Sequence, residues 1–529
     1  MFVHVDTAAV RGVEAFRVRV EVNLASGLPA FTVVGLAQGS VREGRERVAA
    51  ALTNSGFGLP SRRITVNLAP ADVRKVGTAF DLPIAMGILA AAGHVPHEAL
   101  SGRAFVGELG LDGALRPVSG VLSVGLRCRE DGIRGLTVPA GNAAEASLVS
   151  DLQIWPARTL HDVVRWLRNP PGSEVLPPRD LSDPTRRRGP PLGCSSVDVA
   201  WDGPTDRGPD LADVRGQDVA KRALEVSAAG AHNLLMVGPP GSGKTMLARR
   251  LPGLLPPLSP KEGIEVARVH SVAGLLLHGR LPESRPFRAP HHSVSYAGLH
   301  GGGSPLRPGE VSLAHHGVLF LDELPEFRRD VLEMLRQPIE EGHVHLSRAS
   351  GSVRFPSRFL LVAAMNPCPC GHHGDGSDRC LCDLSVLTRY RARVSGPLLD
   401  RVDLRVDVPA LGVADLESFA RAESSAVVAE RVDRARRRQL DRFQQHAGVY
   451  TNAQMGPAEL RRRGGLSPCA RSLLRRAAEG TRLSARAYDR VLRVARTVAD
   501  LDDSEVLAEP HVAEALQYRL GSGVGSRAP

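Results

Sequence analysis

The chain has 529 residues, enough for two or three domains that each bury a hydrophobic core. Its longest apolar stretch, around residues 83–93, is too short to cross a bilayer, and residues 1–6 lack the charged and apolar regions of a signal peptide. We therefore expect a cytoplasmic protein with no membrane partner. The net charge of +10 permits a nucleic-acid partner without establishing one.

The first 168 residues mix strand and helix patterns. Strict alternation of apolar and polar side chains predicts strands at 16–24 and 64–68. Helical patterns occupy 41–52 and 81–92, and Gly93 ends the second of them. We predict one α+β domain over residues 1–168. Between residues 169 and 205 the composition shifts to Pro, Gly, Asp and Arg, which predicts a semi-rigid linker.

A short apolar strand at residues 233–237 runs into a glycine-rich turn that ends in Lys-Thr. The spacing G-x-x-x-x-G-K-[ST] is that of a P-loop, whose backbone N–H groups surround the phosphates of ATP. Lys244 would reach the β- and γ-phosphate oxygens, Thr245 would bind Mg²⁺, and a helix should begin here with its dipole directed at the phosphates. This spacing disfavours the alternative, an ordinary glycine-rich helix start. The predicted ATP-binding residues are Gly238, Pro239, Pro240, Gly241, Ser242, Gly243, Lys244 and Thr245.

Two further apolar runs end in polar side chains. Residues 318–321 precede Asp322 and Glu323, as expected of a buried parallel strand that delivers one carboxylate to Mg²⁺ and the other to a hydrolytic water. Residues 359–365 precede Asn366, whose amide would orient the attacking water. The sequence therefore predicts ATP hydrolysis with Lys244, Glu323 and Asn366 as catalytic residues.

The segment between the P-loop and Asp322 is long and rich in Gly and His, and loops of this length inside a compact domain are usually functional. His291 and His292 within it raise three alternatives, namely a metal site, loop structure or substrate contact, but no further ligands flank the pair at metal-binding spacing. After Glu323, residues 328–341 predict a helix broken by Pro338. The alternating runs 343–348 and 352–355 predict a hairpin.

Four of the seven cysteines crowd into one loop, residues 368–382. Such an arrangement does not resemble a disulfide scaffold. Cys368, Cys370, Cys380 and Cys382 predict a tetrahedral Zn²⁺ site, although the C-x-C pairs are tighter than the usual C-x-x-C. The alternative is a reduced loop that holds no metal.

Arg401 lies just before an alternating strand predicted at 402–408. A parallel sheet binds its nucleotide at the carboxyl ends of its strands, so an arginine at an amino end is on the wrong side for its own site and can serve a neighbouring subunit. Spacing alone equally allows an ion pair with Asp400 or Asp403.

Residues 413–520 show only helical periodicity, which predicts a helical lid, and residues 521–529 predict a disordered tail. The arginine runs 436–438 and 461–463 favour solvated helix faces over DNA contacts.

The chain resembles the ComM/YifB group of magnesium-chelatase-like AAA+ ATPases from about residue 2 to residue 520. The resemblance implies an α/β fold with a P-loop AAA+ core at 206–412 and a helical lid at 413–520. It also implies that the preceding α+β domain is Lon-protease-like (ribosomal protein S5-type). Matching sequence words lie at 35–36, 41–43, 63–72, 80–84, 105–109, 287–293, 307–313, 395–401 and 483–488.

Peptidase activity is not expected of the Lon-like domain. Lon-type proteolysis needs a serine that is activated by a lysine. The nucleophile position falls on Ala79, and no lysine occurs between Lys75 and Lys221.

The same resemblance assigns roles that the residues alone leave open. It places Gln217 in an adenine pocket, makes Arg401 an arginine finger that acts across a subunit interface, and directs Arg486 of a sensor-2 helix at the phosphates. It also implies that the predicted hairpin enters a central pore, where Arg348 and Arg354 would lie near a threaded polyanion. An ordinary surface hairpin is the alternative.

The implied function is that of an ATP-hydrolysing hexameric ring, a homo-oligomer that works as a DNA helicase or branch-migration translocase in recombination of incoming DNA. Its cofactors would be ATP and Mg²⁺, with Zn²⁺ at the cysteines. Two other classes stay open: a magnesium-chelatase-like motor subunit and a protein-remodelling ATPase. The chain has no D-x-S-x-S signature, which argues against a self-contained chelatase.

Overall fold

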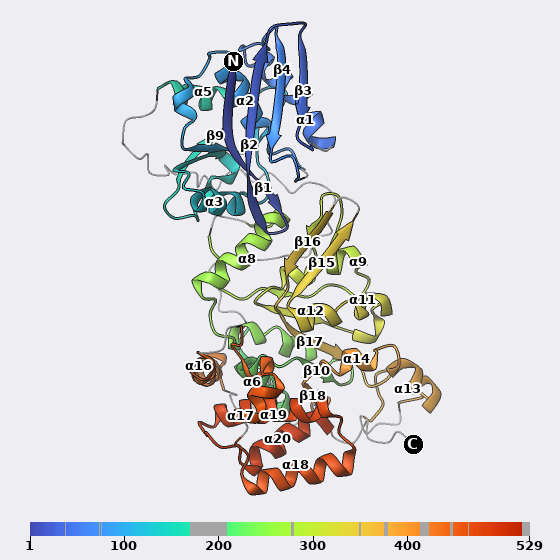
Figure 1. The fold of residues 1–529 in the computed structure, drawn as a ribbon. Helices are drawn as coiled ribbons and strands as arrows, with labels where there is room; N and C mark the ends of the chain where they lie inside the picture. Colours follow the sequence, from blue (N-terminus) through green and yellow to red (C-terminus); the bar gives the residue numbers. More distant parts are fainter. Residues whose placement is uncertain are drawn as a thin grey trace. The chain divides into compact units, whose positions relative to one another are not determined.

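The structure is a computed structural model, and the residues it describes are 1–36, 39–73, 75, 77–169, 209–276, 280–348, 351–374, 379–412, 423–444, 448–463 and 465–520. The predicted tail and, apart from Asn169, the predicted linker lie outside these residues. The described chain forms two compact units, one made of most of residues 1–169 and the other of residues 209–520 (Figure 1). None of the described helices has the length and apolar character needed to span a membrane.

The first unit is built on a seven-stranded sheet in the order β3-β4-β2-β1-β5-β8-β9. The pairs β3–β4, β1–β5, β5–β8 and β8–β9 are parallel, whereas β2 and β4 are antiparallel. The strands are β1 (Phe2–Arg11), β2 (Glu14–Ala25), β3 (Ala30–Val34), β4 (Arg63–Ala69), β5 (Arg103–Phe105), β8 (Gly135–Pro139) and β9 (Gln153–Ala157). The other elements are α1 (Gly39–Asn54), α2 (Asp81–Ala91), α3 (Val121–Glu130), α4 (Ala143–Ala146), α5 (Leu160–Arg168) and the short pair β6 (Glu108–Leu109) and β7 (Leu115–Arg116).

Burial in the first unit follows the sequence patterns. The predicted strands at 16–24 and 64–68 are confirmed as parts of β2 and β4, and every second side chain from Val18 to Leu24 is buried. Helix α2 is buried along its whole length and ends before Gly93, which has a φ of +82°. Lys75 is fully buried, its ammonium donates to the carbonyl oxygen of Pro70, and burial lowers its pKa.

The second unit contains a five-stranded parallel sheet in the order β11-β14-β17-β10-β18. Its three central strands are buried on both faces, as continuous apolar runs predict for a parallel sheet. Because the strands are parallel, their carboxyl ends lie at one edge. The strands are β11 (Phe287–Arg288), β14 (Val318–Leu321), β17 (Leu360–Met365), β10 (Leu234–Val237) and β18 (Leu404–Asp407).

The long segment between the P-loop and Asp322 is not a single loop, because short elements interrupt it. The predicted hairpin is confirmed, and His343 pairs with Pro356 at its open end. The elements between the P-loop helix α7 (Lys244–Ala248) and β14 are α8 (Pro260–Ala273), β11, α9 (Tyr296–His300), β12 (Gly301–Gly302), β13 (Arg307–Pro308) and α10 (Glu310–Leu313). Helix α6 (Asp218–Gly230) precedes the P-loop. After β14 come α11 (Arg329–Glu333), α12 (Arg336–Glu341), β15 (His343–Arg348), β16 (Gly351–Pro356), α13 (Leu384–Arg391) and α14 (Gly396–Leu399).

The helix predicted at 328–341 is broken, but the predicted position of the break is wrong. The break falls at Met334 and Leu335, between α11 and α12. Pro338 lies inside α12 as its third residue. A proline is tolerated there because the first N–H groups of a helix have no intrahelical acceptor.

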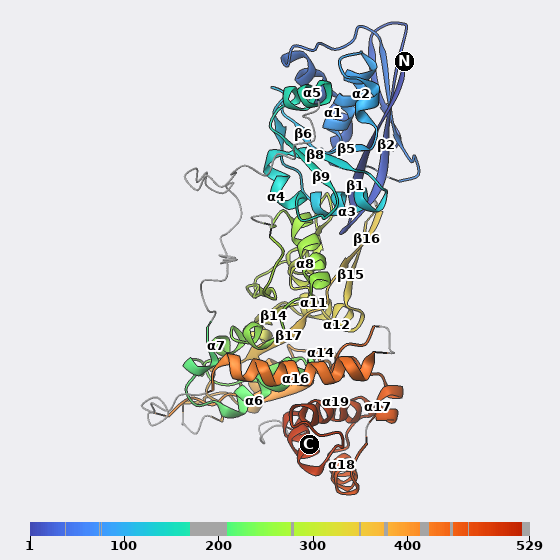
Figure 2. The same ribbon diagram turned by 90° about the vertical axis from the view of Figure 1, so that its left-hand side faces the viewer.

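The described residues from 423 onward confirm the helical prediction, with only an isolated bridge between Leu466 and Leu507. Helices α16 and α19 both pack against α6 (Figure 2). The helices are α16 (Ser425–Phe443), α17 (Pro457–Arg463), α18 (Pro468–Thr481), α19 (Ala485–Leu501) and α20 (Glu509–Leu520).

Arg436 does not lie on a solvated helix face, so the prediction for the run 436–438 is wrong at this position. Its Nη2 donates to the carbonyl oxygen of Ala228, 2.8 Å away, in the last turn of α6. Arg437 beside it is exposed. The last carbonyls of a helix lack intrahelical donors, so Arg436 satisfies one of them and joins α16 to α6.

Candidate nucleotide-binding site

The P-loop connects β10 to α7 through backbone conformations that favour glycine. Gly241 and Gly243 have φ values of +76° and +91°, and α7 begins at Lys244 directly afterwards. A Cβ atom on Gly238 would lie 2.1 Å from the carbonyl oxygen of Val408. The glycines are therefore required by the turn itself and by the strand beside it.

Lys244 points back into its own loop. Its Nζ donates to the carbonyl oxygens of Gly238 and Pro239, at 2.8 and 2.7 Å, and to Oδ1 of Asn366 at 3.3 Å. Burial lowers the pKa of Lys244, and the carboxylates of Asp322 and Glu323 oppose that shift. The arrangement holds a buried cation where the phosphates of a nucleotide would lie.

The residues predicted to bind Mg²⁺ are also together. Thr245 Oγ1 donates to Asp322 Oδ2 over 2.6 Å, although 77 positions separate the two residues. A hydroxyl beside a carboxylate is the kind of oxygen donor set that Mg²⁺ uses with nucleotide phosphates. The site thus fits Mg²⁺ bound together with a nucleotide.

Gln217, which directly precedes α6, contacts the P-loop. It is buried and has a φ of +59°. Its Nε2 donates to the carbonyl oxygens of Ser242 at 3.3 Å and Pro409 at 2.7 Å. The structure therefore brings Gln217 to the P-loop, and its role in an adenine pocket stays a prediction from the family resemblance.

Glu323 has a partner that the sequence did not reveal. His292 Nδ1 lies 3.3 Å from Glu323 Oε2, and the His292 ring stands edge-on to Phe327. The neighbouring His291 bonds Ser293 instead, at 2.8 Å. Among the described residues neither histidine belongs to a group of metal-ligating side chains. Strands β11 and β14 pair in parallel, so the segments that follow them, which carry residues 292 and 323, leave the sheet side by side.

Arg401 and Arg486 are not part of this group of side chains. The carbonyl oxygen of Arg401 accepts from Asn233 Nδ2 at 3.0 Å, which places Arg401 at the amino end of β10, opposite the P-loop. Its guanidinium pairs with Glu340 at 2.5 Å and not with Asp400 or Asp403. Arg486 is exposed in the first turn of α19.

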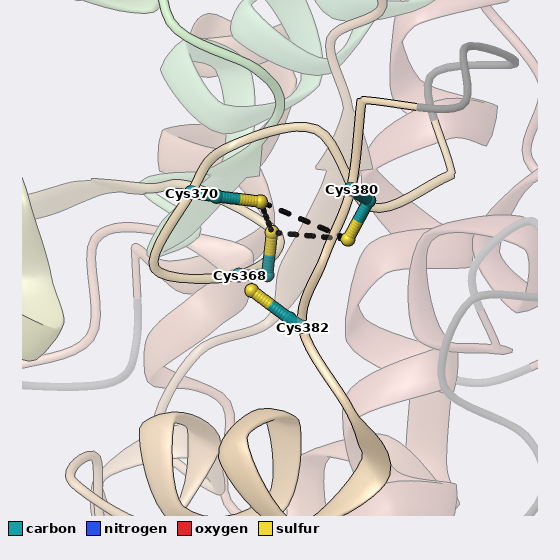
Figure 3. Close-up of side chains that lie close together, drawn as sticks. All are labelled: Cys368, Cys370, Cys380 and Cys382. Atoms are coloured by element: carbon teal, nitrogen blue, oxygen red, sulfur yellow. Dashed lines mark hydrogen bonds between the residues drawn. The ribbon is translucent and has the colours of Figure 1, made fainter.

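The four clustered cysteines converge. All four Sγ atoms lie within 4.8 Å of one another, and Figure 3 shows the thiols of 368 and 370 facing those of 380 and 382. Cys380 Sγ lies 3.9 Å from the sulfur of Cys368 and 3.7 Å from that of Cys370, and the sulfurs of Cys368 and Cys370 are closer together, at 3.2 Å. Four thiolates around Zn²⁺, each about 2.3 Å from the metal, would have sulfurs about 3.8 Å apart. The cluster therefore fits one tetrahedral metal ion.

A second group of candidate ligands, Glu265 with His315 and His316, suits hydrogen bonding better than a metal. The backbone N–H of Arg358 donates to His315 Nδ1 at 3.0 Å, so the proton of the neutral ring is on Nε2. That Nε2 is 3.3 Å from Glu265, and His316 Nε2 is 2.8 Å from the same carboxylate. A protonated Nε2 has no lone pair to give to a metal.

Sequence comparisons place this site in a family. Three family models match: "Magnesium chelatase, subunit ChlI" over residues 210–416, "Subunit ChlI of Mg-chelatase" over 20–142 and "Magnesium chelatase, subunit ChlI C-terminal" over 422–519. The competence protein ComM of Haemophilus influenzae is 46% identical over 516 residues, 97% of each chain. The chain belongs to the ComM/YifB family of magnesium-chelatase-like AAA+ proteins.

Other relatives agree with this membership. The uncharacterized protein YifB of Escherichia coli is 42% identical over 516 residues, which cover 97% of this chain and 96% of YifB. The magnesium-chelatase 38 kDa subunit of Cereibacter sphaeroides is 28% identical over 169 residues, or 29% of this chain and 51% of that subunit. An AAA+ family implies ATP and Mg²⁺, which the geometry of Lys244, Thr245 and Asp322 fits.

We predict that His292 positions the carboxylate of Glu323 for catalysis. Replacing it (His292→Ala) should remove its 3.3 Å contact with Glu323 Oε2. If that polar contact is worth about 1 kcal/mol, kcat for ATP should fall about fivefold with KM unchanged. The matched control is His291→Ala, because His291 bonds Ser293 and not Glu323. Steady-state ATPase assays test this. Equal rates for the two variants would contradict the role of His292.

The group around Glu265 predicts a loss of stability in acid. Burial lowers the pKa of His315 from 6.5 to about 4, and the hydrogen bonds from His315 and His316 lower the pKa of Glu265 from 4.5 to about 2. Both groups bind fewer protons in the folded than in the unfolded protein, so the free energy of unfolding falls as pH falls. This loss occurs between about pH 6.5 and 4 for His315 and between about pH 4.5 and 2 for Glu265.

Between pH 6.5 and 5 the contribution of His315 should be about 2 kcal/mol, because each pKa unit corresponds to about 1.4 kcal/mol. His315→Asn, whose Oδ1 can still accept from Arg358, should lose correspondingly less stability over this range. Urea denaturation at the two pH values measures the difference, with the exposed His345→Asn as control. A His315→Asn protein with the wild-type pH dependence would refute the assignment.

Proposed function

We propose that the chain is the ATP-hydrolysing subunit of a homo-oligomeric ring that moves on DNA, as a helicase or branch-migration translocase. The observation that carries the ATPase assignment is the meeting of Lys244, Thr245, Asp322 and Asn366 at one edge of the parallel sheet. Three strands contribute to this group: Asp322 and Asn366 directly follow the last residues of β14 and β17, and Lys244 and Thr245 follow the glycine-rich turn after β10.

Each side chain has a role in this proposal. Bound Mg²⁺ and ATP supply the triphosphate and the charge neutralisation that phosphoryl transfer needs. Lys244 binds phosphate oxygens, Thr245 and Asp322 hold the metal, and the backbone of the P-loop orients the nucleotide. Glu323 takes the proton of the attacking water, which Asn366 helps to orient. Gln217 belongs to the adenine side of the site.

Two arginines complete the proposal. Arg401 is at the edge of the sheet opposite its own P-loop, so it would stabilise phosphate charge in a neighbouring subunit. It must first leave Glu340, which pairs with it in the isolated chain. Arg486, exposed at the start of α19, would approach the phosphates of its own subunit when the helical region moves. A hexamer is the proposed ring.

The DNA assignment is supported by the relatives and by charge. A protein that is named for competence aligns over 97% of both chains, whereas the magnesium-chelatase 38 kDa subunit aligns with only 29% of this chain. The net charge is +10, and the exposed Arg348 and Arg354 lie on the β15–β16 hairpin. We therefore propose that this hairpin contacts the DNA backbone in recombination of incoming DNA.

Zn²⁺ is the proposed ion at the four cysteines, because tetrahedral thiolate sites suit it and the sulfur spacing fits. The protein would work in the cytoplasm, where thiols stay reduced.

The ATPase proposal predicts distinct phenotypes for three variants. Lys244→Ala should not retain ATP. Glu323→Gln should bind ATP but hydrolyse it on the order of 10²–10⁴-fold more slowly, because the general base is lost. Arg401→Ala should be nearly inactive alone, yet a mixture of Arg401→Ala and Lys244→Ala subunits should regain partial activity at complementary interfaces. The exposed Arg461→Ala is the control. A mixture without recovery would contradict action across the interface.

The DNA proposal predicts that single-stranded and branched DNA increase ATP turnover at low salt. The double variant Arg348→Ala with Arg354→Ala should lose this stimulation but keep the rate without DNA, because the hairpin is outside the ATP site. Arg475→Ala with Arg476→Ala, both exposed on α18, removes the same two charges and is the matched control. Stimulation by an unfolded protein and not by DNA would favour a protein-remodelling ATPase instead.

A further inference from the structure

The cysteine cluster and the P-loop are in direct contact. Gly371, the residue after the first cysteine pair, has a φ of +86°. A Cβ atom built on it would lie 2.5 Å from Cδ and 2.8 Å from Cγ of Pro240. Pro240 is part of the P-loop, so the backbone of the cysteine loop forms one wall of the proposed nucleotide site, without room for a side chain at position 371.

The same loop reaches the site from its other end. Asn366 stands two residues before Cys368, which is fully buried, and Asn366 Oδ1 accepts from Lys244 Nζ at 3.3 Å. The N–H of Gly238 donates to the carbonyl oxygen of Met365 at 3.2 Å. The first cysteine pair is therefore enclosed between two contacts with the P-loop, one through Asn366 and one through Gly371.

The second cysteine pair leads into α13. Asp383 follows Cys382 and caps this helix, with its Oδ1 accepting from the N–H of Val386 at 2.8 Å. Tyr390 near the end of α13 is buried, and burial raises its pKa to about 12 while a backbone hydrogen bond of Asn366 opposes the shift. A metal ion at the four thiols would thus tie the end of β17 to the start of α13.

The hydrogen bonding around the sulfurs also suits a metal-bound thiolate. The backbone N–H of His373 is directed at Cys368 Sγ, 3.3 Å away. Outer hydrogen bonds of this kind stabilise and orient metal ligands.

We propose that the four cysteines bind Zn²⁺ and form a zinc clip. The clip holds the backbone of the cysteine loop against the P-loop, so that metal binding and nucleotide binding are coupled. With Zn²⁺ bound, Gly371 and Asn366 hold Pro240 and Lys244 in the conformation that receives phosphates. Without the metal, Cys368 and Cys370 are no longer tied to Cys380 and Cys382, and the contacts of Gly371 and Asn366 with the P-loop loosen. This inference rests on the proposed nucleotide site and adds a second ligand that regulates it.

Coupling of two ligands is reciprocal, which gives a sharp test. Metal-free protein is prepared with a chelator under reducing conditions, and binding of a fluorescent ADP analogue with Mg²⁺ is measured before and after Zn²⁺ is restored. We expect Zn²⁺ to tighten nucleotide binding about fivefold or more. In the reverse titration, ADP with Mg²⁺ should tighten Co²⁺ binding by the same factor by which Co²⁺ tightens ADP binding, followed through the thiolate-to-Co²⁺ absorption band.

Four variants separate the clip from its effect. Cys370→Ser, which loses a ligand, should bind Co²⁺ more weakly and bind nucleotide like the metal-free protein, whereas Cys382→His, which keeps a ligand, should retain both metal binding and nucleotide binding. Gly371→Ala should keep the Co²⁺ band but bind nucleotide weakly, because its Cβ displaces Pro240. Cys469→Ser, outside the cluster and exposed, should behave like the wild type. Thermal unfolding of each variant checks that it is folded.

The outcomes distinguish two failures. Equal nucleotide affinity with and without metal would overturn the coupling but leave the ATPase proposal standing. A Co²⁺ affinity of Cys370→Ser equal to that of the wild type, or iron in place of zinc in the purified protein, would overturn the zinc clip. If the zinc-loaded protein binds no nucleotide at all, the proposed function fails and the coupling fails with it.

Discussion

The parallel register of β10, β14 and β17 is the constraint on which the site depends. Leu321 at the end of β14 pairs with Ala363 of β17, and Val237 at the end of β10 pairs with Met365. The three strands therefore end at the same edge of the sheet, where the residues after them come within hydrogen-bonding distance. A strand shifted by one residue would turn its side chains to the other face and separate Lys244 from Asn366.

The second unit supports this edge with segments that belong to no strand. The segment after β11 carries His292 to Glu323, and the loop after β17 carries Gly371 to Pro240. His292 follows β11 and contacts Glu323, which follows the neighbouring strand β14. Gly371 follows β17 and contacts Pro240 of the P-loop, which follows the neighbouring strand β10. The contacts on Glu323 and on Pro240 consequently depend on how the connecting segments fold, as well as on the sheet.

The opposite edge of the sheet joins the helical region. Asp403, just before β18, is 3.5 Å from both Arg490 of α19 and His232, and Asp500 inside α19 is buried with Arg442 and Arg496. Burial disfavours ionisation of Asp403, yet His232, Arg490 and Arg493 hold its pKa below the ordinary value. Because a buried charge without its partner is costly, the pair of Asp403 with Arg490 holds α19 against this edge of the sheet.

The sequence alone was sufficient for features with a local physical cause. Apolar runs identified the buried strands, the glycine spacing identified the P-loop, and the alternation at 343–355 identified the hairpin, because each depends on neighbouring residues. Close cysteines in one loop likewise indicated their own cluster. The break in the helix at 328–341 was misplaced, because a proline in a first turn costs little and packing decides where the helix divides.

Only the tertiary structure decided which distant residues meet. It paired His292 with Glu323, Gly371 with Pro240, Arg401 with Glu340 and Arg436 with the end of α6. No spacing in the chain specifies these contacts, since they arise from strand order and from the packing of helices far apart in sequence. Composition and periodicity determine which secondary structure each segment can form. Which charged group or backbone atom a given side chain contacts is determined by the whole fold.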